Sequence, residues 1–289
     1  MKPVRKAVLP VAGLGTRVLP VGKTTSKNLL NVVDRPILSY IVAEGRAAGI
    51  EHFVFIVGRG QAAIEDYFDH HPELEAQLQA KGKTDILADL NAELAKPGEM
   101  SFIRQMSPLG LGHAVWCARD VIGDEPFAVI LPDMLMDATP AAMAQAVAAH
   151  HEVGGNLVMV EPAPEGEAHK YGIVALEGHA GRLNRMTHMV EKPAPGTEPS
   201  NLFINGRYIL QPEIFDLLGS QAAGAGGEIQ LTDAMERLMQ TQAFYAFEYE
   251  GVTYDCGDKI GLLRANVALA LKRPDLKDAA RAAIEALLG

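Results

Sequence analysis

The stretch that decides the fold reads Ala7-Val8-Leu9-Pro10-Val11-Ala12-Gly13-Leu14-Gly15-Thr16-Arg17, and Lys23 and Lys27 follow it. A short apolar run with a β-branched residue predicts a buried strand, which ends where two glycines allow a tight turn. Backbone amides that face one way in such a turn form a concave anion site, and the arginine and lysines add positive charge. The stretch therefore predicts a polyphosphate site, although an ordinary strand and glycine turn would have the same spacing.

The glycine pattern argues against the dinucleotide site of dehydrogenases. That fingerprint requires a third glycine, whereas Gly15 is followed here by Thr16, Arg17 and Val18. We therefore expect a different phosphate loop, in which arginine and lysine side chains neutralise the phosphates.

Length and composition indicate a soluble globular protein, in which any anionic substrate must be held by local cations. The 289 residues can bury a sizeable core, and no apolar run approaches the roughly 20 residues of a membrane span. Residues 1–6 lack the apolar region of a signal peptide, and Cys117 and Cys256 form neither a disulfide framework nor a zinc spacing, so we expect a cytoplasmic protein. The formal charge of −10 disfavours binding to nucleic acid or to membranes.

Segments that resemble strands alternate with segments that resemble helices. After the glycine loop we expect a helix with Asp34 as its cap, Pro36 in its first turn and Gly49 at its end. Strands are expected at 53–57, 100–105, 127–131, 156–161, 201–208 and 243–249, and helices at 61–68, 110–115 and 139–153. This order predicts an α/β fold with a Rossmann-like mixed, mostly parallel sheet flanked by helices, in one domain of residues 1–289.

Two aspartates follow expected strands. Asp133 comes directly after residues 127–131, and Asp255 follows residues 243–249 and a turn at Gly251. Open α/β sheets bind ligands at the carboxyl ends of their strands, and Mg²⁺ prefers one or two carboxylates together with phosphate oxygens and water. The two aspartates therefore predict a metal site, unless both are turn residues.

The run Gly13-Leu14-Gly15-Thr16-Arg17, followed by a lysine, resembles the signature loop of the sugar nucleotidyltransferases. The flanking Leu9-Pro10-Val11-Ala12 narrows the resemblance to the bacterial UTP:glucose-1-phosphate uridylyltransferases. It covers the chain from Lys6 to about Pro274 and implies a nucleotidyltransferase, glycosyltransferase-A-like fold. It also implies a nucleotide-binding half of about residues 1–135, a sugar-binding half of about 136–260 and C-terminal helices in 261–289.

The resemblance implies in-line attack of glucose 1-phosphate on the α-phosphorus of UTP, giving UDP-glucose and pyrophosphate. Arg17, Lys27 and Lys192 would be the catalytic cations, and Asp133 and Asp255 would hold Mg²⁺. The nucleotide would contact Ala12, Gly13, Leu14, Gly15, Thr16, Gln105, Gly110 and Gly112, and the sugar would contact Gly172, Glu191 and Asn205. An amide such as that of Gln105 offers a donor and an acceptor, which suits a uracil edge.

Several charged or titratable residues also have an interpretation without function. Glu191 and Lys192 precede Pro193 on an expected extended segment, which would direct their side chains to opposite faces and leave an exposed charged pair. His113 is typical of a helix start rather than of a general base. The histidine pairs His70-His71 and His150-His151 lack a third ligand at metal spacing, so we expect them to be solvated.

Three positions depart from the family pattern. Asp133 is followed by Met134 where the family often has a second acid, residues 26–31 replace a Pro-Lys-Glu-Met-Leu-Pro run, and Asn205 stands where uridylyltransferases usually carry an apolar residue. Two alternatives therefore stay open. The chain is a nucleotidyltransferase for another hexose 1-phosphate or for dTTP, or it is a non-catalytic paralogue that binds nucleotide sugar and regulates an active partner.

Two further segments concern packing rather than chemistry. Residues 226–233 resemble the family and precede an expected helix with Ala234, Met235 and Leu238 on its core face, so they should shape the sugar side. Residues 262–288 are amphipathic, are broken at Pro274 and suit burial on another subunit, which predicts a homo-oligomer, dimer or tetramer. The other expected partners are UTP and glucose 1-phosphate, with no nucleic acid and no membrane.

Overall fold

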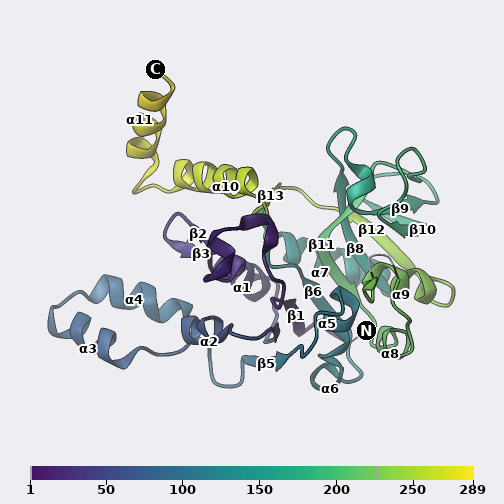
Figure 1. Cartoon of the computed structure of the whole chain (residues 1–289), viewed down its shortest axis with the longest axis horizontal. Helices are drawn as coiled ribbons and strands as arrows, with labels where there is room; N and C mark the ends of the chain where they lie inside the picture. The colour runs from purple at the N-terminus through teal and green to yellow at the C-terminus, as the bar shows by residue number, and fades with distance from the viewer. Residues whose placement is uncertain (1, 225–226) are drawn as a thin grey trace.

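The computed structural model describes residues 2–224 and 227–289. Its centre is a nine-stranded sheet with the strand order β5-β4-β1-β6-β11-β8-β12-β10-β9 (Figure 1). The strands are β1 (Lys6–Pro10), β4 (His52–Val57), β5 (Met100–Arg104), β6 (Phe127–Ile130), β8 (Asn156–Pro162), β9 (Gly172–Leu176), β10 (Leu183–Glu191), β11 (Leu202–Leu210) and β12 (Phe244–Glu248). The predicted α/β fold with a mixed sheet is confirmed.

The parallel half of the sheet carries the glycine loop. β1 pairs in parallel with β4 and β6, and β4 pairs in parallel with β5. Because the carboxyl ends of parallel strands meet at one edge, the loops after β1, β5 and β6 converge there. The second half differs, since β11 runs antiparallel to β6 and β8, and β10 runs antiparallel to β9 and β12. The second half has one parallel pair, β8 with β12, and its other pairings are antiparallel, so the parallel pairing that we expected to dominate the sheet is concentrated in the first half.

Helices cover both faces of the sheet. Along β1, Ala7 and Leu9 belong to one apolar cluster and Val8 to the other, as the alternation of a strand requires. The first cluster is completed by α1 (Ile37–Ala47), α2 (Ala62–Phe68) and α7 (Ala142–Val153), and the second by α5 (Leu111–Trp116), α6 (Arg119–Ile122), α8 (Ile214–Gly219) and α9 (Leu231–Met239). The predicted core face of α9 is confirmed, while Gly226 in the segment before it lies outside the described residues.

Two short two-stranded ribbons correct the sequence analysis. Asp34 does not cap a helix, because it lies in the turn between β2 (Asn31–Val32) and β3 (Arg35–Pro36), and α1 begins after Pro36. Asp255 follows β12 and a bend at Gly251 as expected, but it stands at the end of an additional strand, β13 (Val252–Asp255), which pairs antiparallel with β7 (Met134–Asp137). In that ribbon Asp255 is paired with Met134, the residue after Asp133. The β7–β13 ribbon therefore brings the two aspartates together.

A buried ion pair supports the segment that carries Asp133. Arg207 on β11 is fully buried, and its Nε and Nη2 donate to the two carboxylate oxygens of Glu44 on α1, at 2.9 and 2.7 Å. The same guanidinium donates to the carbonyl oxygens of Leu131 and Met134, at 3.2 and 2.7 Å. These two residues lie on either side of Asp133 in the chain. The Arg207–Glu44 pair therefore fixes the backbone around Asp133 through β11 and α1.

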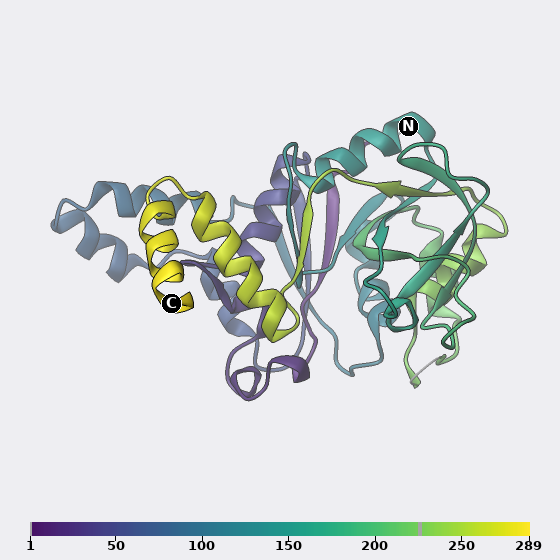
Figure 2. The same ribbon diagram turned by 90° about the horizontal axis from the view of Figure 1, so that it is seen from above.

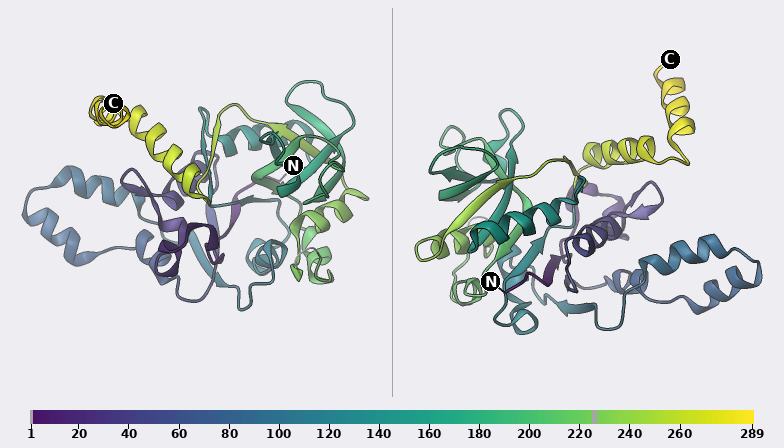
Figure 3. Two further views of the ribbon diagram at one scale, coloured as in Figure 1. Left: turned by 45° about the horizontal axis from the view of Figure 1, so that its top comes forward. Right: turned by 180° about the vertical axis from the view of Figure 1, so that it is seen from behind.

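Two helical pairs project from the same end of the molecule in every view (Figures 2 and 3). They are α3 (Pro72–Ala80) with α4 (Thr84–Glu93), and α10 (Lys259–Lys272) with α11 (Lys277–Leu288). The break expected near Pro274 separates α10 from α11. Within residues 2–224 and 227–289, none of the helices combines the length and the apolar character that crossing a membrane requires.

The histidine pairs follow the expectation in part. His70, His71 and His151 are exposed, but His150 is completely buried on α7, so the expectation of a solvated side chain is wrong for this residue. Its Nε2 lies 3.2 Å from the carbonyl oxygen of Gly155, and burial lowers the pKa of its imidazole. His150 therefore serves packing at the end of α7.

Candidate active site

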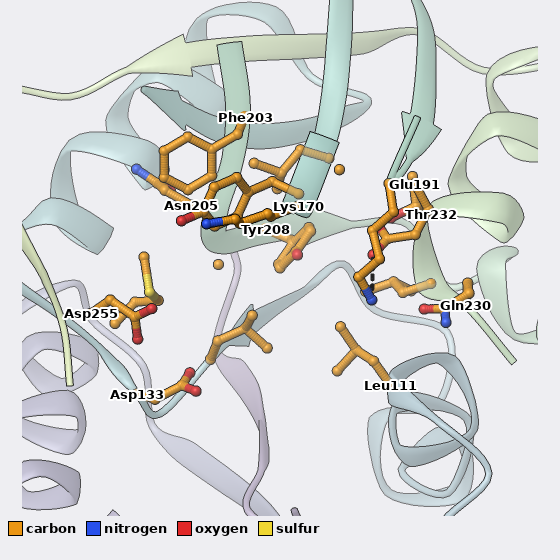
Figure 4. Close-up of a pocket in the computed structure, with 18 of the residues that line it drawn as sticks. Leu111, Asp133, Lys170, Glu191, Phe203, Asn205, Tyr208, Gln230, Thr232 and Asp255 are labelled. Atoms are coloured by element: carbon orange, nitrogen blue, oxygen red, sulfur yellow. Dashed lines mark hydrogen bonds and ion pairs between the residues drawn. The ribbon is translucent and has the colours of Figure 1, made fainter. Parts of the chain in front are cut away.

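Two adjoining cavities lie where the two halves of the sheet meet. The first, which we call the β11 cavity, has a volume of about 590 Å³, and its lining includes Arg17, Asp133, Gly172, Glu191, Lys192, Asn205 and Asp255 (Figure 4). The second, the glycine-loop cavity, has a volume of about 580 Å³, and its lining includes Ala12, Gly13, Leu14, Gly15, Thr16, Arg17, Lys27, Gln105, Gly110 and Asp133. Arg17 and Asp133 line both cavities, so they stand at the junction.

The glycine loop is fixed by its neighbours. Gly15 has a φ of 63°, in the left-handed region that favours glycine, and it precedes the short helix η1 (Thr16–Val18). The turn that carries Lys27, η3 (Lys27–Leu29), is tied to the end of β1 because the buried Asn28 donates from Nδ2 to the carbonyl oxygen of Val11 at 3.2 Å. Gln61 donates to the same oxygen at 2.8 Å. Lys27 is therefore held beside the glycine loop.

Four charged side chains form a cluster at the junction of the cavities. The Nζ of Lys27 lies 2.5 Å from Oδ2 of Asp133, and Nη2 of Arg17 lies 3.4 Å from the same oxygen. The other terminal nitrogen of Arg17 lies 3.1 Å from Oδ2 of Asp255. Arg17 thus bridges the two carboxylates, which Figure 4 shows on the same side of the β11 cavity.

The surroundings set the charge of the two carboxyl groups in opposite directions. Burial acts to raise the pKa of Asp133, but Lys27 and Arg17 outweigh it, so the pKa lies below the ordinary value and the group is ionised at neutral pH. Burial dominates at Asp255, and with the charge of Asp133 nearby it raises the pKa of Asp255 above its ordinary value in spite of Arg17. A bound cation would favour ionisation of both.

The two aspartates suit a metal ion that takes most of its ligands from a bound phosphate and from water. Within the part of the chain that the structure describes, no three His, Cys, Asp or Glu side chains gather as a metal site. Asp133 and Asp255 supply carboxylate oxygens from adjacent ends of the β7–β13 ribbon. Mg²⁺ accepts one or two carboxylates when phosphate oxygens and water complete its octahedron. The two aspartates therefore fit Mg²⁺ in the company of a phosphorylated ligand.

The backbone at Lys192 differs from the extended form that we expected. Lys192 has a φ of 47°, in the left-handed region, and its Nζ lies 3.4 Å from Oε1 of Glu191. Both residues line the β11 cavity, so the expectation that their side chains point to opposite faces is wrong. Glu191 is oriented by Thr232, whose Oγ1 donates to Oε2 at 2.7 Å. A Cβ at Gly172 would lie 3.0 Å from that same oxygen, so glycine keeps this wall open.

Gln105 and Gly110 also line the glycine-loop cavity. Gln105 is 9% exposed, and its Nε2 lies 3.2 Å from the carbonyl oxygen of Gly110 and 3.0 Å from Nδ1 of His113. Burial lowers the pKa of His113, which accepts this hydrogen bond in its neutral form. Gly112 lines neither cavity. Instead, its N–H donates to the carbonyl oxygen of Ile229 at 2.8 Å, so it packs α5 against the segment before α9.

Sequence reasoning missed part of the β11 cavity wall. Its lining also includes Leu111, Lys170, Phe203, Tyr208 and Gln230, all labelled in Figure 4. Phe203 could have been found from Asn205, because residues two apart on a strand share a face. Gln230 belongs to residues 226–233, which we expected to shape the sugar side, whereas Lys170 and Tyr208 are brought to the wall by the tertiary fold.

Comparisons with known proteins find relatives that match nearly the whole chain. The family described as nucleotidyl transferase matches residues 6–272. The UTP–glucose-1-phosphate uridylyltransferase of Bacillus subtilis (strain 168) is 44% identical over 288 residues, which are 100% of this chain and 98% of that protein. The structure of UTP-bound UGPase from Acinetobacter baumannii is 39% identical with a TM-score of 0.90, over 97% of this chain and 98% of that one. A UDP-glucose pyrophosphorylase complexed with UDP-glucose is 35% identical with a TM-score of 0.82, over 93% and 100%.

Proposed function

Because the chain belongs to the nucleotidyl transferase family, we propose that it transfers a uridylyl group from UTP to α-D-glucose 1-phosphate, giving UDP-glucose and pyrophosphate. One observation carries this proposal: Arg17, Lys27, Asp133 and Asp255 meet where two cavities, each large enough for one substrate, adjoin. The names and bound molecules of the full-length relatives agree with these two substrates.

UTP is assigned to the glycine-loop cavity. Gln105 and Gly110 would receive the base: Gly110 and His113 hold the NH₂ group of Gln105, and its amide oxygen would accept a hydrogen bond from the N3–H of uracil. The loop of residues 12–16 would receive the phosphates on its amides, and Arg17 adds charge at its end. The α-phosphorus would then lie near the junction of the cavities.

Glucose 1-phosphate is assigned to the β11 cavity. Glu191, already oriented by Thr232, is placed to accept hydrogen bonds from sugar hydroxyls, and Gly172 leaves room for the ring. Asn205 contributes an amide from β11. Lys192 would hold the sugar phosphate at the side that faces the α-phosphorus.

The chemical problem is the approach of two anions. Two unit charges 4 Å apart repel by about 4 kcal/mol at an effective dielectric constant near 20. Arg17, Lys27 and Lys192 offset this repulsion, and fixing both substrates in line can remove roughly 7 to 11 kcal/mol of the barrier. The attacking phosphate oxygen is already ionised at neutral pH, so the proposed reaction requires no general base and no covalent intermediate.

We assign Asp133 and Asp255 as the holders of Mg²⁺. When bound, the ion would neutralise charge that develops on the phosphate oxygens during transfer. Lys27 and Arg17, which pair with Asp133, would also offset the charge of the triphosphate. Their ion pairs compensate the buried carboxylate.

A pyrophosphate-release assay tests the proposal. Purified protein is given each of UTP, dTTP, ATP and GTP with glucose 1-phosphate, galactose 1-phosphate or mannose 1-phosphate, with Mg²⁺ or with EDTA. The proposal expects turnover with UTP and glucose 1-phosphate that EDTA abolishes. A preference for another pair would identify a different nucleotidyltransferase, and silence across the panel with retained UDP-glucose binding would identify a regulatory paralogue.

Two wider properties belong to the same proposal. Cys117 and Cys256 are unpaired, which agrees with a reducing compartment, and we place the enzyme in the cytoplasm. We also propose a homo-oligomer, because no described residue of α11 is buried and Leu287 and Leu288 are 86% and 83% exposed. Light scattering coupled to gel filtration measures the subunit number, and a monomer would contradict this part.

A further inference from the structure

Asn205 presents an unpartnered acceptor to the β11 cavity. The residue is 1% exposed, yet its side chain belongs to the cavity wall, where Figure 4 shows it near Phe203 and Tyr208. Among the residues that the structure describes, none donates a hydrogen bond to its Oδ1. Leaving a buried acceptor unpaired is costly, so this oxygen calls for a donor from a ligand.

A chain of hydrogen bonds behind the strand sets the orientation of this amide. The Nδ2 of Asn205 lies 3.5 Å from Oε2 of Glu161 on β8. The same carboxylate oxygen accepts a hydrogen bond from Oγ1 of Thr253 at 2.5 Å, and this hydroxyl also contacts the hydroxyl of Tyr249 at 2.5 Å. Oε2 already accepts the hydroxyl proton of Thr253, so it faces Asn205 as an acceptor and the NH₂ group of Asn205 is the partner that fits it. The opposite orientation would place two acceptors against each other.

The backbone prevents Asn205 from turning away. The pairing of β11 with β8 shifts register between Ile204 and Tyr208, and Gly206 within this irregularity has a φ of 89°, which favours glycine. The next residue, Arg207, is locked by its bonds to Glu44. The two residues that follow Asn205 are therefore fixed, and its side chain is held in one orientation.

We propose that Asn205 Oδ1 accepts a hydrogen bond from one hydroxyl of the hexose, and that this contact selects hexose 1-phosphates carrying a hydroxyl at that ring position. This inference rests on the proposed function and adds a specificity-determining residue to it. A hydroxyl is required because the amide oxygen cannot pair with a fluorine or a hydrogen in its place. A site with a fixed acceptor rejects such analogues more strongly than an apolar wall does.

The test uses glucose 1-phosphate and its 2-, 3-, 4- and 6-deoxyfluoro analogues, since fluorine occupies the place of the hydroxyl without donating. The kcat/KM of the wild-type enzyme is measured for each with saturating UTP, and the series is repeated with Asn205→Val. We expect one analogue to lose about 10- to 100-fold in the wild type relative to glucose 1-phosphate. The same analogue should lose less than about threefold in Asn205→Val, because neither partner of the hydrogen bond remains.

The comparison separates Asn205 from other contacts to the sugar. An analogue that loses activity equally in both proteins reports a different residue, such as Glu191, and does not count as support. UTP affinity and the thermal unfolding temperature of Asn205→Val are measured in parallel, and the wild-type series remains informative if this variant does not fold.

The outcomes are distinct. If the wild-type enzyme turns over glucose 1-phosphate, and its kcat/KM for each of the four analogues lies within about threefold of that value, this inference is overturned and the proposed function is not. Losses that persist unchanged in Asn205→Val also overturn it. Absence of turnover with glucose 1-phosphate overturns the proposed function, and this inference with it.

Discussion

Replacing Lys192 by alanine should separate activity from stability. The Lys192 side chain is 55% exposed, and its ion pair with Glu191 has an N···O distance of 3.4 Å. Exposed pairs of this kind contribute about 0 to 1 kcal/mol to folding. Lysine and alanine both have a Cβ and pay a similar cost for the left-handed backbone at this position. We therefore expect the free energy of unfolding of Lys192→Ala to fall by less than about 1 kcal/mol.

The effect on turnover should be much larger. A cation aimed at a phosphate oxygen 4 Å away interacts with it by about 4 kcal/mol at an effective dielectric constant of 20. Removing one such stabilising group from an active site typically lowers kcat by about 10²- to 10³-fold, which is about 2.7 to 4 kcal/mol. The variant should therefore unfold in urea almost as the wild type does but release pyrophosphate at least about 100 times more slowly.

Lys170 provides a matched control. It lines the same cavity, its side chain is 52% exposed, and it pairs with Glu167 at 2.7 Å. If Lys192 acted only through the general positive charge of the cavity, Lys170→Ala would lower kcat as much. We expect a change within about threefold. Near-normal turnover of Lys192→Ala, or equal losses in the two variants, would refute the role given to Lys192.

Three further substitutions test the scaffold. Arg207→Met leaves the carboxylate of Glu44 buried without its partner and should cost about 3 to 5 kcal/mol of unfolding free energy, measured by urea denaturation. Gly112→Ala places a Cβ 2.7 Å from a backbone oxygen and should cost about 1 to 3 kcal/mol in the same assay; an unchanged midpoint would mean that α5 is not packed as described. Burial acts to raise the pKa of Glu99, but hydrogen bonds from Arg46 and a backbone N–H outweigh it and lower the pKa. The ionised Glu99 therefore stabilises the folded state at neutral pH, and this stabilisation is lost as the pH falls below the ordinary glutamate pKa of about 4.3. Glu99→Gln should accordingly flatten the loss of stability between about pH 5 and pH 3, and an unchanged slope in urea titrations would contradict the assignment.

The first half of the fold was predictable because its signals are local. Continuous apolar runs such as those of β1 and β4 occur where a strand is covered on both faces, and a glycine turn at the end of β1 marks the edge where ligands bind. Asp133 follows β6 and was expected at that same edge, where the structure places it beside Arg17 and Lys27.

The second half was less predictable because strand direction is a tertiary property. The nine residues of β11 are all buried, which identifies a central strand, but burial carries no information on whether the neighbours run parallel. The antiparallel insertion of β11 between β6 and β8 depends on the connections around it. The register shift beside Asn205 depends on that insertion as well.

Single residues failed where the fold overrode a local preference. A residue before proline favours an extended backbone, yet Lys192 adopts a left-handed one and thereby shares a cavity with Glu191. The polar pair His150-His151 predicted two solvated side chains, yet His150 is buried on α7. The contact of Gly112 with the nucleotide stays a prediction, but its tight contact with Ile229 could not be anticipated from spacing.

The stereochemistry of transfer tests the central claim most directly. UTP made chiral at the α-phosphorus by a single sulfur substitution is converted with glucose 1-phosphate, and the configuration of the resulting thio-UDP-glucose is assigned by phosphorus NMR. A single in-line displacement between the two cavities, with Arg17, Lys27 and Lys192 around the phosphates, predicts inversion at phosphorus. Retention would indicate two displacements through a covalent enzyme intermediate and would contradict the account.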